Sequence, residues 1–391
     1  MSAALTRRLE AFAPARGAEF ARFAGFVLLC FAASRALHYG VYLWGAVPGG
    51  RSFAQALCQF DCGWYLHTAT HGYDTAPHAH DAGDAANWAF FPLYQALVAL
   101  VAALTTLPPL LAGILLSNIL AIATGLLAFA YFDSAAARRY FVVILSFAPF
   151  SFYLNAVYTE SLFLFLVMGG LVALKSGAFL RAGAWGFLLS AARPVGVFFC
   201  FAMLVAMLRE HLRAGGRWRG FPAHMLRRPE LITAILFSVS GLFGFMVYLH
   251  WHMGDAFAFS HVQRAWGREI GNPLAVLWDA LGANDLALFL AHDHSRQWCA
   301  AWTLLWFALA GVLAARRMWP ECIFAMFCLV VPLATSIQSM PRYGFGVAPL
   351  LIAAALVLER LSPGVLRAGL VLAALNIPLL AMWFAGHGGL I

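Results

Sequence analysis

The chain has 391 residues, of which 63% are hydrophobic and 11% are charged, and its mean hydropathy is +0.79. About a quarter of the residues in a soluble domain are charged, so this composition excludes an ordinary soluble domain. The net charge of +8 comes from arginines that flank apolar runs, which indicates membrane topology rather than a nucleic-acid partner. The apolar runs are continuous and lack strict alternation, so we expect an all-α polytopic membrane protein and not a β-barrel.

The first predicted span covers residues 23–45. It follows four arginines, namely Arg7, Arg8, Arg16 and Arg22. Because cytoplasmic flanks carry the excess of positive charge, we expect the N-terminus in the cytoplasm and residues 46–108 in a first outer loop with surface helices. This loop contains the unusually polar stretch QFDCGWYLHTATHGYD at residues 59–74. Cys58 and Cys62 stand close together here, and their spacing fits either a disulfide or a metal site.

The segment 89–105 decides the topology of everything that follows it. If 89–105 and 109–132 both crossed the membrane, Arg138 and Arg139 would lie outside and every later basic loop would be inverted. The apolar part of 89–105 is bounded by prolines and has roughly 15 residues, which is short for a full span. We therefore expect this segment to lie along the outer surface or to dip into it.

The later crossings then alternate with every basic loop inside. A break at Arg193–Pro194 divides 179–208 into two short helices that meet on the outer side, because proline removes a backbone donor. A second large outer loop covers 251–298, and we treat 1–391 as a single membrane domain. About eleven crossings result: 23–45, 109–132, 140–155, 160–174, the two halves of 179–208, 231–250, 299–315, 320–338, 343–358 and 367–386.

This alternation gathers polar residues on the outer side, where ionisable groups beside apolar segments are candidates for a functional site. Asp61 and Glu160 are the carboxylates nearest the predicted membrane surface, and either could act as general base toward an acceptor hydroxyl. Guanidinium groups suit the oxygens of a lipid phosphate, and four arginines lie outside against the charge trend. They are Arg193, Arg264, Arg268 and Arg342. The candidates for a substrate pocket are Trp64, Tyr65, His71, Tyr158, Glu160 and Gln263.

Each of these residues also has a structural interpretation. A single outer arginine can reach lipid headgroups or pair with an outer acid, and Glu160 can cap the helix that follows it. Trp64 and Tyr65 fit an aromatic belt at the membrane interface as well as a substrate contact. Arg35 and His38 lie in the outer half of the first span, where pairing with another helix is as good an interpretation as a functional role.

One stretch of the first outer loop contains enough histidine and aspartate to suggest a metal site. Its members are His71, His78, His80, Asp81 and Asp84. Their irregular spacing in a stretch rich in alanine and glycine favours a solvated loop. We therefore expect no metal site and no obligatory cofactor.

At residues 60–74, FDCGWYLHTATHGYD followed by AFFPLYQALV resembles the first outer loop of the GPI second mannosyltransferase (PIG-V-like) family and its bacterial relatives. Three further matches come in the same order, namely APFSFYLNAVYTESLF, AARPVG, and GDAFAFSHVQRAWGR with SMPRYG after it. The matches span residues 60 to about 350. Phe60 stands where the family usually has tryptophan, and PLYQ replaces PLYP.

That family is part of the type C glycosyltransferase superfamily, whose members resemble one another in a multi-span helical fold and a polyprenyl-phosphate sugar donor. Their first outer loop carries an essential acid, so the resemblance implies Asp61 as the catalytic residue of an inverting transfer. It also implies Arg342, in SMPRYG, as a contact of the donor phosphate. The helix break at Arg193 and the surface position of FFPLYQALV agree with the same family pattern.

We therefore expect a membrane glycosyltransferase that moves a sugar, mannose before others, from a polyprenyl-phosphate donor to a hydroxyl acceptor on a glycolipid, glycan or protein. The alanine- and arginine-rich chain indicates a bacterial inner membrane, with the site facing the periplasm. Bacteria do not make GPI, so the acceptor stays open. Membrane lipids are expected partners and nucleic acid is not. The alternative is a lipid or solute transporter or flippase, whose polar residues would line a path through the bilayer.

Overall fold

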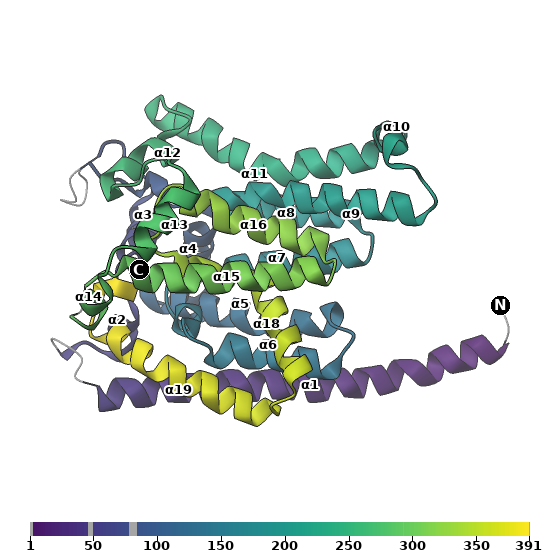
Figure 1. The fold of residues 1–391 in the computed structure, drawn as a ribbon, viewed down its shortest axis with the longest axis horizontal. Coiled ribbons are helices and arrows are strands. Elements are labelled where there is room, and N and C mark those ends of the chain that lie inside the picture. Colours follow the sequence, from purple (N-terminus) through teal and green to yellow (C-terminus); the bar gives the residue numbers. More distant parts are fainter. Residues whose placement is uncertain (1–2, 46–49, 78–83, 292, 391) are drawn as a thin grey trace.

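The computed structural model describes residues 3–45, 50–77, 84–291 and 293–390, and within these ranges every regular element is a helix. A helix occupies each of the eleven expected crossings. In chain order these are α1 (Ala3–Trp44), α5 (Pro109–Tyr131), α6 (Ala135–Phe147), α7 (Glu160–Lys175), α8 (Phe179–Ala192), α9 (Phe199–Arg213), α11 (Pro229–Met253), α15 (Arg296–Ala315), α16 (Trp319–Leu333), α18 (Ala348–Leu361) and α19 (Val365–Phe384). Most of them run along the long axis of the molecule (Figure 1). The chain is thus an all-α polytopic membrane protein.

The helices differ in their capacity to span a bilayer alone. Six segments of the described chain are long and apolar enough, namely α1 from Gly17, α5, Pro194–Arg213, α11, α15 and α19. The helices α6, α7, α8, α16 and α18 have only 13, 16, 14, 15 and 14 residues. A lone span needs about 20 residues, but short helices and irregular backbone are tolerated at membrane depth where protein surrounds them. α7 meets this condition, because 12 of its 16 residues are buried.

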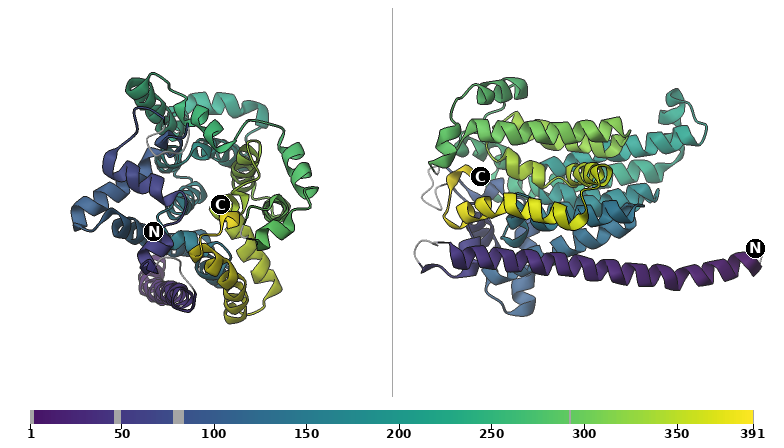
Figure 2. Two further views of the ribbon diagram at one scale, coloured as in Figure 1. Left: turned by 90° about the vertical axis from the view of Figure 1, so that its left-hand side faces the viewer. Right: turned by 60° about the horizontal axis from the view of Figure 1, so that its bottom comes forward.

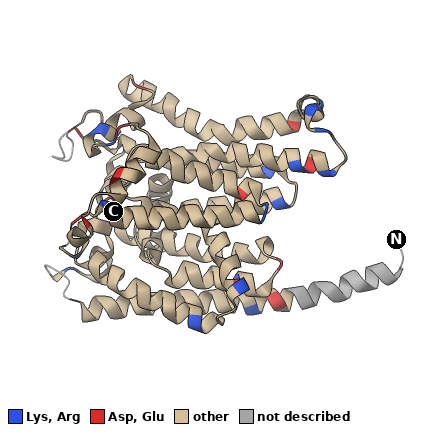
Figure 3. Cartoon of the chain, viewed as in Figure 1, with Lys and Arg blue, Asp and Glu red and all other residues tan. Residues whose placement is uncertain are grey.

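The two ends of the bundle differ in structure and in charge. One end, here called the loop end, carries short helices: α2 (Phe53–Leu57), α3 (Cys62–His71), α12 (Ala258–His261), α13 (Pro273–Leu281) and α14 (Leu286–Leu290) (Figure 1; Figure 2, left). The opposite end, here called the basic end, carries α10 (Phe221–Arg227) and most of the lysine and arginine of the described residues (Figure 3). The basic loops therefore share one end of the fold, as the alternation predicted.

The segment whose position decided the topology forms α4 (Pro92–Thr105). Pro92 occupies its first turn, and Thr106 ends it in a left-handed conformation. α4 packs against α3, α5 and α8, and it lies beside α3 near the loop end (Figure 1). The expectation that this segment stays at one surface agrees with this placement. α5 then crosses toward the basic end, which puts Arg138 and Arg139 there.

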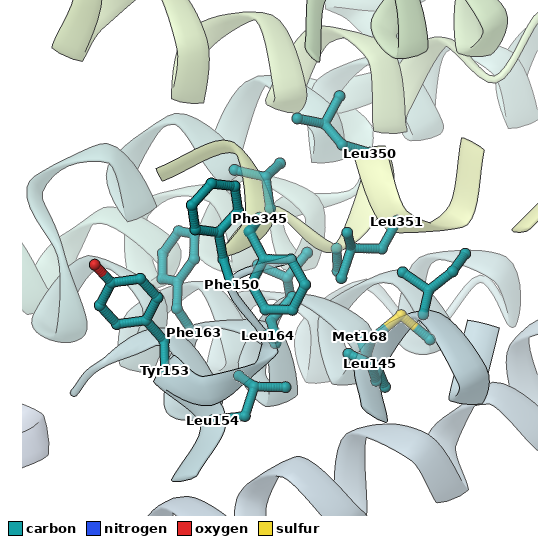
Figure 4. Close-up of a cluster of buried hydrophobic side chains, with 14 of the residues drawn as sticks. Leu145, Phe150, Tyr153, Leu154, Phe163, Leu164, Met168, Phe345, Leu350 and Leu351 are labelled. Carbon is teal, nitrogen blue, oxygen red and sulfur yellow. The ribbon is translucent and has the colours of Figure 1, made fainter. Parts of the chain in front are cut away.

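A buried apolar cluster fills the bundle beneath the loop end. Figure 4 shows side chains from η3 (Ser151–Asn155), α7, α17 (Met340–Phe345) and α18 meeting there. The cluster includes Phe150, Tyr153, Phe163, Leu164, Met168, Phe345, Leu350 and Leu351, each no more than 1% exposed. This packing fixes where α7 and α17 begin, and both helices contribute charged side chains to the site described below.

Helices α8 and α11 approach each other closely through small residues. A Cβ atom added to Gly241 would lie 2.2 Å from the carbonyl oxygen of Phe187, and one added to Gly183 would lie 2.6 Å from that of Ala234. Small residues at such contacts let helix backbones pack tightly within a membrane. The contact matters for the site because α8 ends at Ala192, directly before Arg193.

We expect Gly241→Val to destabilise the protein by about 1–3 kcal/mol, since the added atoms must force α8 and α11 apart. Gly244→Val is the matched control. Gly244 lies on the same helix as Gly241, and a Cβ added to it would meet no atom within 4 Å. Thermal unfolding of the detergent-solubilised variants checks this. Equal melting temperatures for the two variants would contradict the close packing of these helices.

Candidate active site

Asp61 lies in a turn that a distant tyrosine holds in place. It is the first residue before α3, and Phe60 ahead of it adopts a left-handed conformation with φ of 49°. The Asp61 N–H donates to the Tyr158 hydroxyl at 3.1 Å, and that hydroxyl donates to the Gln59 carbonyl at 2.9 Å. Tyr158 is fully buried just before α7. The position of Asp61 is therefore tied to the start of α7.

A disulfide also constrains this turn. Cys58 and Cys62, which the sequence left open between a disulfide and a metal site, are bonded to each other. The bond closes a loop around Asp61, and such a crosslink restricts the conformations of the unfolded segment. The turn that carries the acid is thus held both covalently and by Tyr158.

The Asp61 carboxylate pairs with Arg342. Arg342 Nη1 donates to Asp61 Oδ2 at 2.6 Å, although the two residues stand 281 positions apart in the sequence. The Arg342 side chain is 6% exposed, whereas that of Asp61 is 26% exposed. Aromatic rings surround the guanidinium, with the ring centres of Tyr153, Tyr158 and Tyr343 between 5.1 and 5.7 Å from it. The rings add cation–π attraction and shield the pair from water.

Glu160 and Arg193 form a second pair beside the first. Arg193 is extended between α8 and η4 (Pro194–Phe198), so the predicted break is present. Its Nη2 lies 2.6 Å from Glu160 Oε1, and its Nε donates to Thr159 Oγ1 at 2.7 Å. Arg342 Nε lies 3.6 Å from the same oxygen of Glu160. The four side chains Asp61, Glu160, Arg193 and Arg342 are here called the acid–arginine cluster, whose formal charges cancel.

The cluster retains unused capacity for hydrogen bonds. Among the described residues, no group makes a well-directed hydrogen bond to either oxygen of Glu160 or to Arg342 Nε, although all three atoms are buried. Glu160 therefore holds the arginines by charge and proximity rather than by aligned hydrogen bonds. Buried polar atoms normally have partners, so exceptions at one place point to a ligand site. Thr159, not Glu160, is the capping position of α7, and the carboxylate caps nothing.

Burial and the charges of the site shift the pKa of Tyr65 and of Arg342, and these shifts bear on which group could act as a base. Burial, and then the negative charges of Asp61 and Glu160, raise the pKa of Tyr65 above its usual range. Tyr65 therefore stays protonated, and its hydroxyl lies 3.4 Å from Thr159 Oγ1. Burial opposes the charged form of Arg342, but Asp61 and Glu160 outweigh it and raise the pKa of Arg342. Among these groups, a carboxylate is the better candidate for a base.

Two segments at the loop end, one before and one after the middle of the chain, meet through aromatic side chains. Trp64 stacks on Phe90 with ring centres 5.8 Å apart and contacts Trp266 edge-on at 5.8 Å. Trp266 belongs to η6 (Val262–Trp266) in the second loop. Trp64 is half-buried and Tyr65 is buried, so neither is a simple interface-belt residue.

Four further predicted residues are not members of the acid–arginine cluster, namely Gln263, Arg264, Arg268 and His71. Arg268 Nη1 donates to Gln263 Oε1 at 3.1 Å. Burial raises the pKa of Tyr343, but the charges of Arg268 and Arg342 outweigh it and lower this pKa, which puts Arg268 near the cluster. Arg264 is exposed on η6. His71 is exposed at the end of α3, where it stacks on His67 with ring centres 4.7 Å apart.

The structure also places the polar residues of two further sequence hypotheses. Arg35 and His38 pair with other elements: Arg35 donates to Asn118 and to the Leu154 carbonyl, and His38 Nδ1 contacts the Asn155 amide. They hold η3 under the site. Of the stretch that imitates a metal site, His78, His80 and Asp81 lie outside the described residues. Within the described ranges, no group of three or more His, Cys, Asp or Glu is placed to hold a metal.

Several site residues were not singled out as candidates from the sequence. They are Gln59, Tyr153, Thr159, Phe163 and Tyr343, which support the cluster through hydrogen bonds or ring contacts. Gln59 lies in the polar stretch 59–74, and the other four lie in the motifs APFSFYLNAVYTESLF and SMPRYG. Those stretches were the available signal for them.

No family model and no curated protein matches the chain. Among solved structures, it is similar to the oligosaccharyltransferase of Archaeoglobus fulgidus in the apo form, with a TM-score of 0.48 and 12% identity. The match covers 94% of this chain and 56% of the archaeal one, so the chain spans little more than half the length of that protein. Similarity of this degree does not establish a shared fold or activity.

We expect Glu160→Gln to destabilise the protein more than Asp61→Asn does. Removing one partner of a buried ion pair costs about 3–5 kcal/mol, because the other charge stays buried. Glu160 is fully buried between two arginines, whereas the exposed part of Asp61 reduces its cost to about 1–2 kcal/mol. Thermal unfolding of the two solubilised variants tests the order. A more stable Glu160→Gln variant would show that Glu160 does not hold the cluster together.

Proposed function

We propose that the chain is a membrane glycosyltransferase. It transfers a sugar, most simply mannose, from a polyprenyl-phosphate donor to a hydroxyl acceptor at the outer face of a bacterial inner membrane. The observation that carries the proposal is the 2.6 Å contact between the Asp61 carboxylate and the Arg342 guanidinium at the loop end. A candidate base and a candidate phosphate-binding group therefore occupy one site.

The reaction requires a base on one side of the sugar and an anion site on the other. Asp61 takes the proton of the acceptor hydroxyl as its oxygen forms a bond to the anomeric carbon. The bond from that carbon to the phosphate oxygen breaks in the same step, and polyprenyl phosphate leaves with the electron pair. One displacement without a covalent enzyme intermediate inverts the anomeric configuration.

The arginines of the site stabilise the leaving phosphate. Arg342 and Arg193 are held by their contacts before any ligand arrives, and preorganised charge is the most effective form of electrostatic catalysis. Arg268 adds positive charge beside Tyr343, while Arg264 is exposed on η6 and would meet a ligand only at the rim. Trp64, Tyr65, Tyr158, Gln263 and His71 are the other pocket candidates, with His71 the most peripheral.

The distribution of polar residues supports an enzyme over a transporter. A transport path needs polar groups through the depth of the membrane. The apolar packing of Phe150, Phe163, Leu164 and Phe345 adjoins the cluster instead, where Arg193 lies over the Phe163 ring (Figure 4). The side chains labelled in this packing are apolar apart from the Tyr153 hydroxyl.

We expect Asp61→Asn to reduce sugar transfer by about 10²–10⁴-fold, the usual contribution of a general base. The assay supplies polyprenyl-phosphate-mannose and hydroxyl acceptors, and NMR of the product reads the anomeric configuration. Asp255→Asn is the matched control, because Asp255 is an acid at the loop end that pairs with His261 instead. An equally active, normally folded Asp61→Asn enzyme would refute the assignment of the base.

We also expect EDTA to leave activity unchanged, because arginines rather than a metal ion neutralise the leaving monophosphate. Activity is measured before and after chelation, with Mg²⁺ or Mn²⁺ added back. Loss of activity that either ion restores would show that a metal takes part.

A further inference from the structure

Both arginines of the acid–arginine cluster already have carboxylate partners. Arg342 Nη1 donates a hydrogen bond to Asp61 Oδ2, and Arg193 Nη2 lies 2.6 Å from Glu160 Oε1. A phosphate that binds these guanidinium groups must compete with the carboxylates for the same N–H donors. The Asp61 oxygen that accepts from Arg342 is also occupied, so it is not open to the hydroxyl of an acceptor. The base and the phosphate site therefore obstruct each other while they remain paired.

The two acids are not equally free to move away. Glu160 is fully buried in the first turn of α7, with Arg193 at 2.6 Å and Arg342 at 3.6 Å. Asp61 is 26% exposed, stands in a turn before a short helix, and its side chain does not cap that helix. Its backbone is fixed by the bond from its N–H to Tyr158 and by the adjacent disulfide. A rotation of the Asp61 side chain thus requires no movement of the main chain.

The Nε of Arg342 is not free for an incoming anion, because it is buried and lies 3.6 Å from Glu160 Oε1. Guanidinium groups bind phosphate most strongly through two parallel N–H···O bonds. The Nε–H of a guanidinium lies on the same side as Nη2, so the parallel pair that includes Nη1 is Nη1 with Nη2. An anion can bind this pair only if Nη1 gives up Asp61.

We propose that the donor phosphate displaces Asp61 from Arg342, so that the base becomes free only when the sugar donor is bound. This inference rests on the proposed function and concerns the order of events at the same site. The phosphate takes the Nη1 and Nη2 donors of Arg342, and Glu160 keeps both arginines in position. The released carboxylate turns toward the exposed side, where an acceptor hydroxyl arrives. Donor binding therefore precedes productive acceptor binding.

The test is the affinity of a short isoprenyl monophosphate, citronellyl phosphate, for the full chain in nanodiscs, measured by calorimetry. Asp61→Asn removes the competing charge, so we expect it to bind this probe about tenfold more tightly while transfer is lost. Asp61→Ser is a second variant in case the first does not fold, since serine is also favoured before a helix. Asp255→Asn, with the same change of charge at the loop end, should keep the wild-type affinity.

The outcomes separate this inference from the proposed function. Arg342→Gln should weaken binding of citronellyl phosphate strongly. If it does, but the Asp61 variants bind the probe no more tightly than the wild type, the displacement is refuted and the phosphate site stands. If the wild type binds no probe, or Arg342→Gln binds it unchanged, the proposed phosphate site itself is wrong, and the displacement falls with it.

Discussion

The burial of two guanidinium groups at the edge of an apolar core is the constraint on which this structure depends. An unpaired charge in such a place is very costly, so Arg193 and Arg342 require the carboxylates of Glu160 and Asp61. Meeting that requirement brings four separate segments together: the turn before α3, the first turn of α7, the break after α8, and α17. The site is thus where distant parts of the fold are joined, and its geometry is set by their packing.

The acid–arginine cluster lies between a tightly packed apolar region and the two loops of the loop end. Below it, α7 and α17 are fixed by the apolar packing of Figure 4. At the loop end, the two loops meet through Trp64 and Trp266. The Cys58–Cys62 disulfide holds the turn between these layers. The same turn carries Asp61, so the group assigned to proton transfer stands on a fixed main chain but keeps a movable side chain.

The sequence was sufficient for the features that follow from local chemistry and from charge. Proline at 194 predicted the break at Arg193, and the parity of basic loops required that residues 89–105 not cross, in agreement with α4 beside α3. The contact between Asp61 and Arg342 could not be predicted from the sequence, because topology places both residues at one end without specifying which side chains touch. The same holds for Tyr158, whose hydroxyl fixes the turn from 97 residues away. The pairing of Cys58 with Cys62 depends on the geometry of a turn that the spacing alone does not define.

The central claim is that one site holds the donor phosphate on Arg342 and presents Asp61 to the acceptor. The most direct measurement is an electron cryomicroscopy structure of the full chain with a non-hydrolysable polyprenyl-phosphate-mannose analogue. The account predicts phosphate oxygens about 3 Å from Nη1 and Nη2 of Arg342, with the Asp61 carboxylate released and facing the position of the acceptor hydroxyl. A phosphate bound elsewhere, with the Asp61–Arg342 pair intact, would contradict it.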